Sequence, residues 1–191
     1  MRDLKRIITT SSYDRGLEHL LKMWPDIKKE VPEAELNIYY GWQLFDRFNA
    51  TNSSAMALKD RMVKMMQYEG ITDHGRIPQH ELEKEYEKAG IWAYSTHFGE
   101  INCISAIKAQ AAGCEPVVVN YAALKETVQY GRKVEGDIYD EETQELFKIQ
   151  LISALKNPME DKKREEMSRW AKDKYSWDKL AVDWTNEFNG K

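Results

Sequence analysis

The segment from Ser95 to Asn102 holds the polar residues whose types and position are best suited to chemistry. It follows the apolar run Gly90 to Tyr94 and precedes Ile104 and Ile107, which recur at helical spacing. A helix that begins just after a strand presents unpaired N–H groups and the positive end of its dipole, and both attract anions. The pattern therefore predicts an anionic ligand near Ile101 to Cys103.

The elements around this segment form a strand, helix, strand unit. Gly113 ends the helix, and the β-branched run Val117 to Val119 forms the second strand. In an open parallel sheet, ligands bind beyond the carboxyl ends of the strands. The polar turn after Tyr94 is expected at that place.

The rest of the chain repeats the alternation of strands and helices. Further strands are expected at Arg6 to Thr10, Glu35 to Tyr40, Gly70 to Gly75 and Lys133 to Gly136. Further helices are expected from Leu17, around Met56 to Met66, from Pro78, over Ala122 to Tyr130 and over Glu141 to Leu155. This alternation predicts an α/β fold, a Rossmann-like parallel sheet with helices on both faces. Residues 1–191 are read as one domain, with 158–191 as a charged helical tail.

Pro25 is expected to kink the helix that begins at Leu17, or to end its first part. Residues 42–54 show no clear period and are expected to be irregular, with the next helix capped near Asn52 or Ser53.

The last segment of the tail places apolar side chains on one helix face. These side chains are Trp177, Leu180, Ala181, Trp184 and Phe188. Packing against its own domain is the expected role of this face, and a cleft or an oligomer surface is the alternative.

Composition excludes several classes of protein. The net charge of −4 comes from interleaved acids and bases, so no basic stripe indicates nucleic-acid binding. No apolar run reaches the roughly 20 residues of a membrane span, and the first residues lack a signal-peptide core. We therefore expect a cytoplasmic protein. Cys103 and Cys114 are expected to be packed, reduced thiols.

Several catalytic motifs are absent. The first expected turn, TTSSYDRGL, lacks the Gly-x-Gly-x-x-Gly of dinucleotide folds, and the chain has no Walker loop and no Asp-x-Asp triplet. The histidines have no ligand spacing, so no metal site is expected. A Cys103 and His97 nucleophile pair is conceivable but lacks a third, orienting group.

The order of the segments resembles a known family. TTSSYDRGLEHLLKMWP, LNIYYGW, ITDHGRIPQHELEKEYEKAGIWAYSTHFGE, ISAIKAQAAGCEPVVVNYAALKETV and YSWDKLAVDW together cover nearly the whole chain. The chain is similar to the C-terminal, donor-binding half of GT-B glycosyltransferases, closest to glycosyltransferase family 4. The resemblance implies one half of a GT-B architecture.

The resemblance also implies roles for single residues. Arg15, followed by Gly16, would hold the donor's diphosphate, and Glu100 would orient the donor sugar through its hydroxyls. Without the resemblance, Arg15 reads as a solvated turn residue, and His74 alone is weak evidence of a site. The further donor-binding residues that it implies are Ser11, Ser12, His74, Gly75, Arg76, Gly99, Ile101, Asn102, Cys103 and Lys108.

Two departures from the family pattern affect this site. Lys108 stands where members have a glutamate that accepts hydrogen bonds from the ribose hydroxyls, and an ammonium can only donate. It would contact a phosphate instead, or extend to solvent. Many members also carry a basic residue about five positions before Arg15, where this chain has Thr9, Thr10 and Ser11. We therefore expect weaker diphosphate binding than a basic pair gives.

The implied function is sugar transfer from a nucleotide diphosphate, such as UDP or GDP, to an acceptor, with retention and without a metal or other cofactor. Family members have an N-terminal acceptor domain, and the resemblance covers only the C-terminal one. Its partners would be the nucleotide sugar and either such a domain or a second copy of the chain. A non-catalytic binding or assembly module on the same fold is the alternative, and another nucleotide-sugar enzyme such as an epimerase is a third possibility.

Overall fold

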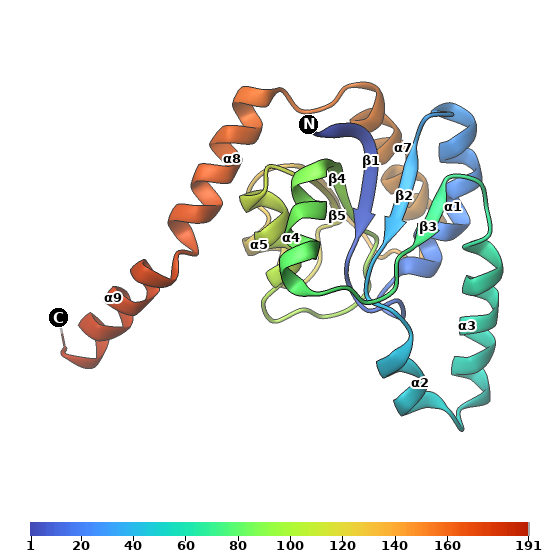
Figure 1. Cartoon of the computed structure of the whole chain (residues 1–191), viewed down its shortest axis with the longest axis horizontal. Coiled ribbons are helices and arrows are strands. Elements are labelled where there is room, and N and C mark those ends of the chain that lie inside the picture. The colour runs from blue at the N-terminus through green and yellow to red at the C-terminus, as the bar shows by residue number, and fades with distance from the viewer. Residues whose placement is uncertain (191) are drawn as a thin grey trace.

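A parallel sheet runs through the centre of the computed structural model, which describes residues 1–190 (Figure 1). Its strands are β1 (Asp3–Thr9), β2 (Glu35–Ile38), β3 (Ile71–Asp73), β4 (Ala89–Tyr94), β5 (Glu115–Val119) and β6 (Arg132–Val134). In that part of the chain the sheet has 6 strands in the order β3-β2-β1-β4-β5-β6, and every pair is parallel. Each expected strand is present, with bounds that differ by a few residues.

The strand order reverses between β1 and β4, which lie side by side although about eighty residues separate them. Ile7 aligns with Ile91 and Ile8 with Trp92. The loops that follow these two strands therefore meet at the carboxyl edge of the sheet. This topological switch point is where doubly wound folds bind their ligands.

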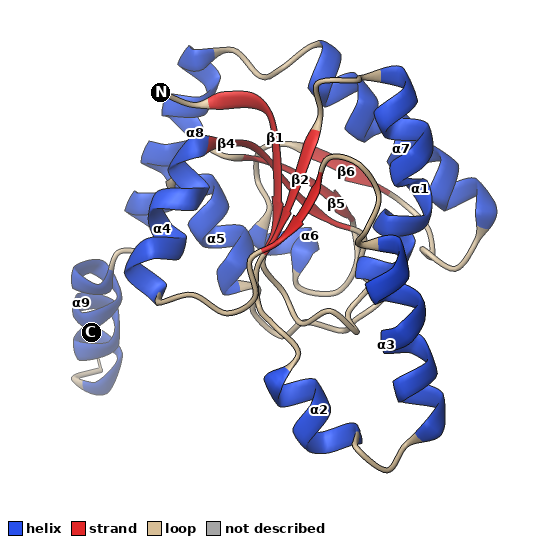
Figure 2. Ribbon diagram, turned by 45° about the vertical axis from the view of Figure 1, so that its right-hand side comes forward, coloured by secondary structure: helices blue, strands red, loops and turns tan. Residues whose placement is uncertain are grey.

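Two helical layers cover the sheet, because side chains along each strand alternate between its faces (Figure 2). Ile7 packs in one apolar cluster with α1 (Leu17–Glu30), α3 (Ser53–Met65) and α7 (Glu141–Lys156). Ile8 and Trp92 pack in the other, with α4 (Gln79–Lys88), α5 (Ile104–Ala111) and α6 (Leu124–Thr127). The Rossmann-like α/β prediction is confirmed.

Two local predictions were wrong, those for residues 42–54 and 122–130. The segment expected to be irregular contains α2 (Gln43–Asn49), because Phe45 turns inward and packs edge-on against Trp42 at 5.2 Å. Of the two outcomes expected for Pro25, a kink or an end of the helix, the second does not occur, because α1 continues to Glu30. The helix expected over 122–130 is shortened to α6, and Gln110 of α5 binds the backbone that follows it.

The tail is helical, as expected. α8 (Asp161–Lys174) packs along α5, and Arg164, Met167 and Ala171 are buried there. α9 (Trp177–Phe188) extends away from the body of the molecule (Figure 1) and buries no residue. The expectation that its apolar face packs on its own domain was wrong, because the helix leaves the domain before that face reaches a partner surface. No helix within residues 1–190 has the length and apolarity needed to cross a membrane.

Candidate functional site

Arg15 and Glu100 meet at the switch point. Arg15 lies in the loop after β1, Glu100 lies in the loop after β4, and Nη1 of Arg15 is 3.2 Å from Oε1 of Glu100. The side chain of Arg15 is 35% exposed and that of Glu100 is 13% exposed. An arginine and a carboxylate that are 85 positions apart thus form one partly solvated ion pair.

Gly16 makes this meeting possible. Its φ of 108° is a left-handed conformation, and a Cβ there would lie 2.1 Å from the carbonyl oxygen of Ser95. The Ser95 hydroxyl donates a hydrogen bond of 2.9 Å to the Gly16 carbonyl oxygen. The two loops therefore touch through their backbones, which a side chain at this position would prevent.

Two aromatic residues contact this ion pair, and the sequence analysis did not identify either of them as a site residue. The guanidinium carbon of Arg15 lies 3.8 Å from the centre of the Phe98 ring, a close cation–π contact. The Tyr94 hydroxyl donates to Oε1 of Glu100 at 2.8 Å, and burial raises the pKa of Tyr94. Phe98 adjoins the predicted residues in the turn, but Tyr94 reads only as the end of a buried strand.

The backbone after Glu100 offers donors to an anion. The N–H groups of Ile101, Asn102 and Cys103 form no hydrogen bond with other residues in the described part of the chain. Gly99, Ile101 and Asn102 are exposed. Cys103 is the N-cap of α5 and is buried, and this burial raises the pKa of its thiol to about 11. Cys103 is therefore a packed thiol, and only its backbone faces the site.

The hydroxyls of the first loop are largely occupied. Ser12 donates to Oδ1 of Asp14 at 2.5 Å, and Ser11 is half-buried beside it. Thr10 is buried, with its hydroxyl 2.6 Å from the Tyr86 hydroxyl and accepting from Trp92 at 3.1 Å. Thr10 therefore supports the core and does not replace the missing basic residue.

Hydrogen bonds and a ring contact hold the turn after β3. Nε2 of His74 lies 2.8 Å from Oδ1 of Asn37, and its ring stacks on Tyr39 at 4.5 Å. Burial, followed by the charge of Arg6, lowers the pKa of His74. The Gly75 N–H donates to Asp73, and its carbonyl oxygen accepts from Tyr40. Both backbone groups of Gly75 are thus already bound inside the protein.

Arg76 and Lys108 line one cavity of about 380 Å³ at this edge of the sheet. Thr10, Tyr39, Tyr40, Tyr86 and Ser105 contribute to its wall. Nζ of Lys108 is 3.4 Å from Oε1 of Glu83 on α4, and the two side chains are 33% and 56% exposed. Two cations thus border a cavity without an acidic lining residue. No group of three or more His, Cys, Asp or Glu residues suited to a metal occurs between Met1 and Gly190.

Comparisons with solved structures show the same fold in several glycosyltransferases. The pneumococcal O-GlcNAc transferase GtfA, in complex with UDP and GlcNAc, is similar with a TM-score of 0.75 and 13% identity, over 99% of this chain and 36% of that chain. Sucrose-phosphate synthase from Thermosynechococcus elongatus is similar with a TM-score of 0.76 and 16% identity, over 97% of this chain and 45% of that chain. Anabaena HepE, in complex with UDP and glucose, is similar with a TM-score of 0.70 and 11% identity, over 97% of this chain and 48% of that chain. This chain thus spans less than half of each of these proteins.

The comparison with protein families covers most of the sequence. The family described as glycosyl transferases group 1 matches residues 7–174. No curated protein matches the chain. The chain therefore belongs to the glycosyl transferases group 1 family, and it has the fold of one Rossmann-like half of a GT-B glycosyltransferase.

Proposed function

We propose that this chain is the donor-binding half of a glycosyltransferase. It binds a nucleotide-diphosphate sugar at the carboxyl edge of the sheet and supports sugar transfer with retention and without a metal. The observation that carries the proposal is the meeting of Arg15 and Glu100 beside the N-terminus of α5. A cation, a carboxylate and open backbone donors then surround one point at a topological switch.

Arg15 and the open N–H groups of Ile101, Asn102 and Cys103 would hold the diphosphate. The guanidinium carries five N–H donors, of which one contacts Glu100. Charge-assisted hydrogen bonds to phosphate are about twice as strong as neutral ones. These donors are in place before the leaving group develops its charge, so their contribution to transfer is electrostatic.

Glu100 would orient the donor sugar. Both of its contacts, with Arg15 and Tyr94, are made by Oε1. Oε2 forms no hydrogen bond with residues 1–190, and a carboxylate oxygen accepts hydrogen bonds from hydroxyl groups. One oxygen thus fixes the side chain, and the other remains open to the sugar.

The nucleoside would occupy the cavity that Arg76 and Lys108 line. Its volume of about 380 Å³ falls within the usual range for small-molecule sites. Aromatic walls from Tyr39 and Tyr40 suit a base or a ribose.

Calorimetric titration of the intact chain with UDP, GDP and ADP tests the donor site. Saturable binding of one nucleotide is expected, weakened at least roughly tenfold in Arg15→Ala, which removes a charge-assisted contact. Glu100→Ala should weaken binding only when the sugar is attached. Arg61→Ala is the matched control, because Arg61 of α3 forms an ion pair with Glu18 at 3.3 Å and does not line the cavity of Arg76 and Lys108. Absence of binding by all three nucleotides at millimolar concentration contradicts the proposal.

The acceptor-binding half would come from a second polypeptide or domain. The chain spans 36% of GtfA and 48% of HepE, and α9 presents Trp177, Trp184 and Phe188 at 85%, 62% and 77% exposure. Such an apolar face is typical of an interaction surface. Sedimentation of the wild type and of Trp184→Glu checks whether this face joins two copies of the chain.

A non-catalytic module is the second candidate function. Lys108 in place of an acceptor and the occupied hydroxyl of Thr10 are the observations that favour it. In that case the wild type does not bind nucleotide measurably, and Lys108→Glu restores an acceptor and strengthens binding. Lys163→Glu, at an exposed position of α8, makes the same change in net charge and should have no effect. Weaker binding in Lys108→Glu alone would instead identify Lys108 as a ligand contact.

A further inference from the structure

The guanidinium of Arg15 is restrained by few hydrogen bonds. Its one side-chain hydrogen bond among residues 1–190 runs from Nη1 to Oε1 of Glu100 at 3.2 Å. A single bond of this length leaves a planar group free to turn about it, so it does not fix the direction of the other N–H groups. The side chain of Arg15 is also 35% exposed, so packing alone does not fix it either.

The ring of Phe98 supplies a second restraint. The guanidinium carbon of Arg15 lies over this ring, 3.8 Å from its centre, and guanidinium groups stack on aromatic faces at such distances. The N–H donors of a guanidinium lie in its own plane. A ring against its face therefore restrains the group and occupies none of its donors.

Hydrogen bonds hold the turn that carries Phe98. The Phe98 N–H donates to Oγ1 of the buried Thr96 at 2.9 Å, and the Phe98 carbonyl oxygen accepts from the Glu100 N–H at 2.9 Å. The Glu100 carbonyl oxygen accepts from the Ala123 N–H at 3.1 Å. The two residues that contact the Arg15 side chain are thus joined to each other through their backbones.

Phe98 does not serve the apolar core. It is 39% exposed and belongs to neither of the two clusters that cover the sheet. A single exposed aromatic residue is common in proteins, but this one lies over the cation proposed to bind the diphosphate. A contact between Phe48 and Arg47 on α2 is much looser, because that distance is 6.0 Å and Phe48 is 77% exposed.

We infer that Phe98 is a positioning residue of the donor site, whose ring holds the guanidinium of Arg15 in one orientation for the diphosphate. The inference deepens the proposed function and rests on it, because Arg15 is the proposed diphosphate ligand. A side chain that is already ordered loses less conformational entropy when the ligand binds. The contact also favours arginine over lysine at this position, because only a guanidinium is planar.

Calorimetric titration of the intact chain with UDP and with inorganic pyrophosphate tests this role. Phe98→Leu keeps an apolar side chain but removes the aromatic face, so the affinity for both probes should fall roughly threefold to tenfold. Phe98→Tyr keeps the ring and should restore the affinity to within about twofold of wild type. Tighter binding in Phe98→Leu would show that the ring competes with the diphosphate, and would overturn the inference.

A double-mutant cycle separates positioning from a general effect on the fold. In the Arg15→Ala background, Phe98→Leu should have no further effect on the affinity for pyrophosphate, because the ring acts through Arg15. Equal effects in both backgrounds would contradict the inference. Phe48→Leu is the matched control, because Phe48 also lies near an arginine but lines neither the cavity of Arg76 and Lys108 nor the turn of Glu100. Melting temperatures check that each variant is folded.

NMR of the chain without ligand measures the contact itself. The Nε–H signal of Arg15, assigned by its loss in Arg15→Lys, should be shifted upfield by the ring and should move downfield in Phe98→Leu. Phe98→Tyr should keep the upfield shift. A signal that does not respond to Phe98→Leu would mean that the ring does not hold the guanidinium, and the inference would fail.

Failure of this inference and failure of the donor site give different results. If UDP binds through Arg15 but Phe98→Leu leaves its affinity unchanged, the donor site stands and the inference fails. If pyrophosphate binding depends on both Arg15 and Phe98 while no nucleotide binds more tightly than pyrophosphate, Phe98 positions an anion ligand and the nucleotide proposal fails. If neither UDP nor pyrophosphate binds, both fail.

Discussion

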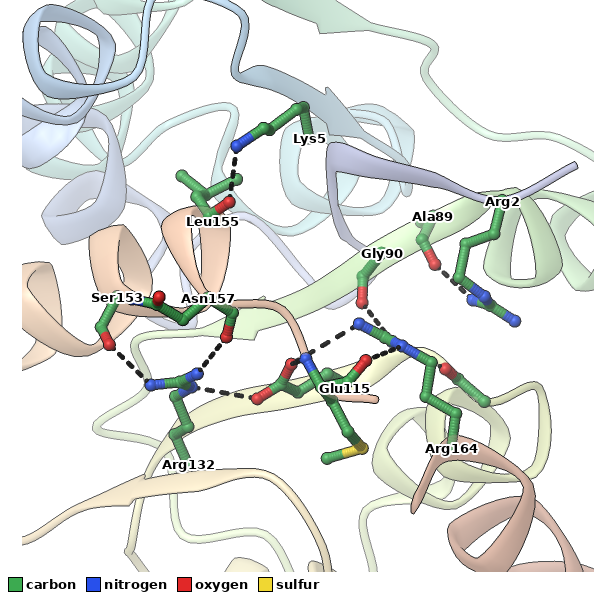
Figure 3. Close-up of polar contacts among 12 residues, drawn as sticks. Arg2, Lys5, Ala89, Gly90, Glu115, Arg132, Ser153, Leu155, Asn157 and Arg164 are labelled. Atoms are coloured by element: carbon green, nitrogen blue, oxygen red, sulfur yellow. Dashed lines mark hydrogen bonds and ion pairs between the residues drawn. The ribbon is translucent and has the colours of Figure 1, made fainter. Parts of the chain in front are cut away.

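The ion pairs at the two edges of the sheet differ in how far they are exposed to solvent and in how many of their polar atoms are paired. At the amino edge, Glu115 lies between Arg132 and Arg164 and its side chain is 3% exposed (Figure 3). At the carboxyl edge, Arg15 and Glu100 are partly solvated, and each keeps polar atoms that bind no other residue in the described chain. The arginines and the carboxylate of the amino edge are paired mostly with groups of their own chain, whereas those of the carboxyl edge keep more polar atoms without a partner.

At the amino edge, these two arginines connect helices to the sheet. Arg132 donates to Glu115 at 3.0 Å, to Ser153 at 2.9 Å and to the carbonyl oxygen of Asn157 at 2.9 Å. Arg164 binds the carbonyl oxygens of Gly90 and Gly113. These contacts fasten the end of α7 and the start of α8 to the sheet.

Glu115→Ala tests the ion pairs of the amino edge and should have the largest effect on the free energy of unfolding. It leaves the buried Arg164 and the partly buried Arg132 without their counter-charge, a change that costs about 3–5 kcal/mol of unfolding free energy. Urea unfolding measures it, with Glu165→Ala on the exposed side of α8 as the control, expected within about 0.5 kcal/mol of wild type. A small effect of Glu115→Ala would show that these ion pairs do not stabilise the fold.

Gly16→Ala tests how the two loops of the open edge meet. A Cβ would lie 2.1 Å from the Ser95 carbonyl oxygen, and a left-handed backbone costs a non-glycine residue about 1–2 kcal/mol before that contact is relieved. We expect lower stability in urea together with weaker nucleotide binding, since Arg15 is displaced. Gly99→Ala is the control in the same site, because a Cβ there meets no atom within 4 Å. Unchanged binding in Gly16→Ala would contradict the role of the backbone contact.

Arg15→Ala should separate stability from binding. A partly exposed ion pair contributes at most about 1 kcal/mol to folding, so the urea midpoint should shift far less than in Glu115→Ala. Nucleotide affinity should fall at the same time, as described above. A stability loss as large as that of Glu115→Ala would mean that the carboxyl edge is built for stability as well, and the contrast between the edges would fail.

Lowering the pH should slightly reduce the free energy of unfolding, because it protonates histidines near the carboxyl edge more readily in the unfolded chain. His19 has a lowered pKa in the folded state, so between pH 7.5 and 5.5 the unfolded chain binds more protons and the unfolding free energy falls as the pH falls. His74 acts in the same direction. The loss should be smaller in His19→Gln and unchanged in His80→Gln, whose side chain is 72% exposed. Urea unfolding at both pH values measures it, and an equal loss in His19→Gln would contradict the assignment.

Periodicity alone determined most of the architecture. Three features follow from the sequence pattern alone. They are the alternation of Ile7 and Ile8 between two apolar clusters, the glycine that ends α5, and the polar turn after β4. These are local patterns with a period of two or 3.6 residues, and each is complete within one element. The failures, at α2 and α6, came where tertiary contacts of Phe45 and Gln110 overrode weak local signals.

The composition of the site was decided by the tertiary structure. The resemblance named Arg15 and Glu100, but their pairing, and the support of Tyr94 and Phe98, depend on strands β1 and β4 being neighbours. A cavity of about 350 Å³ likewise joins loops from β4, β5 and β6 that no local pattern connects. The sequence by itself determined which elements form and where their polar turns lie. Only the tertiary structure decided which of those turns touch, because strand order arises from long-range packing of the whole sheet.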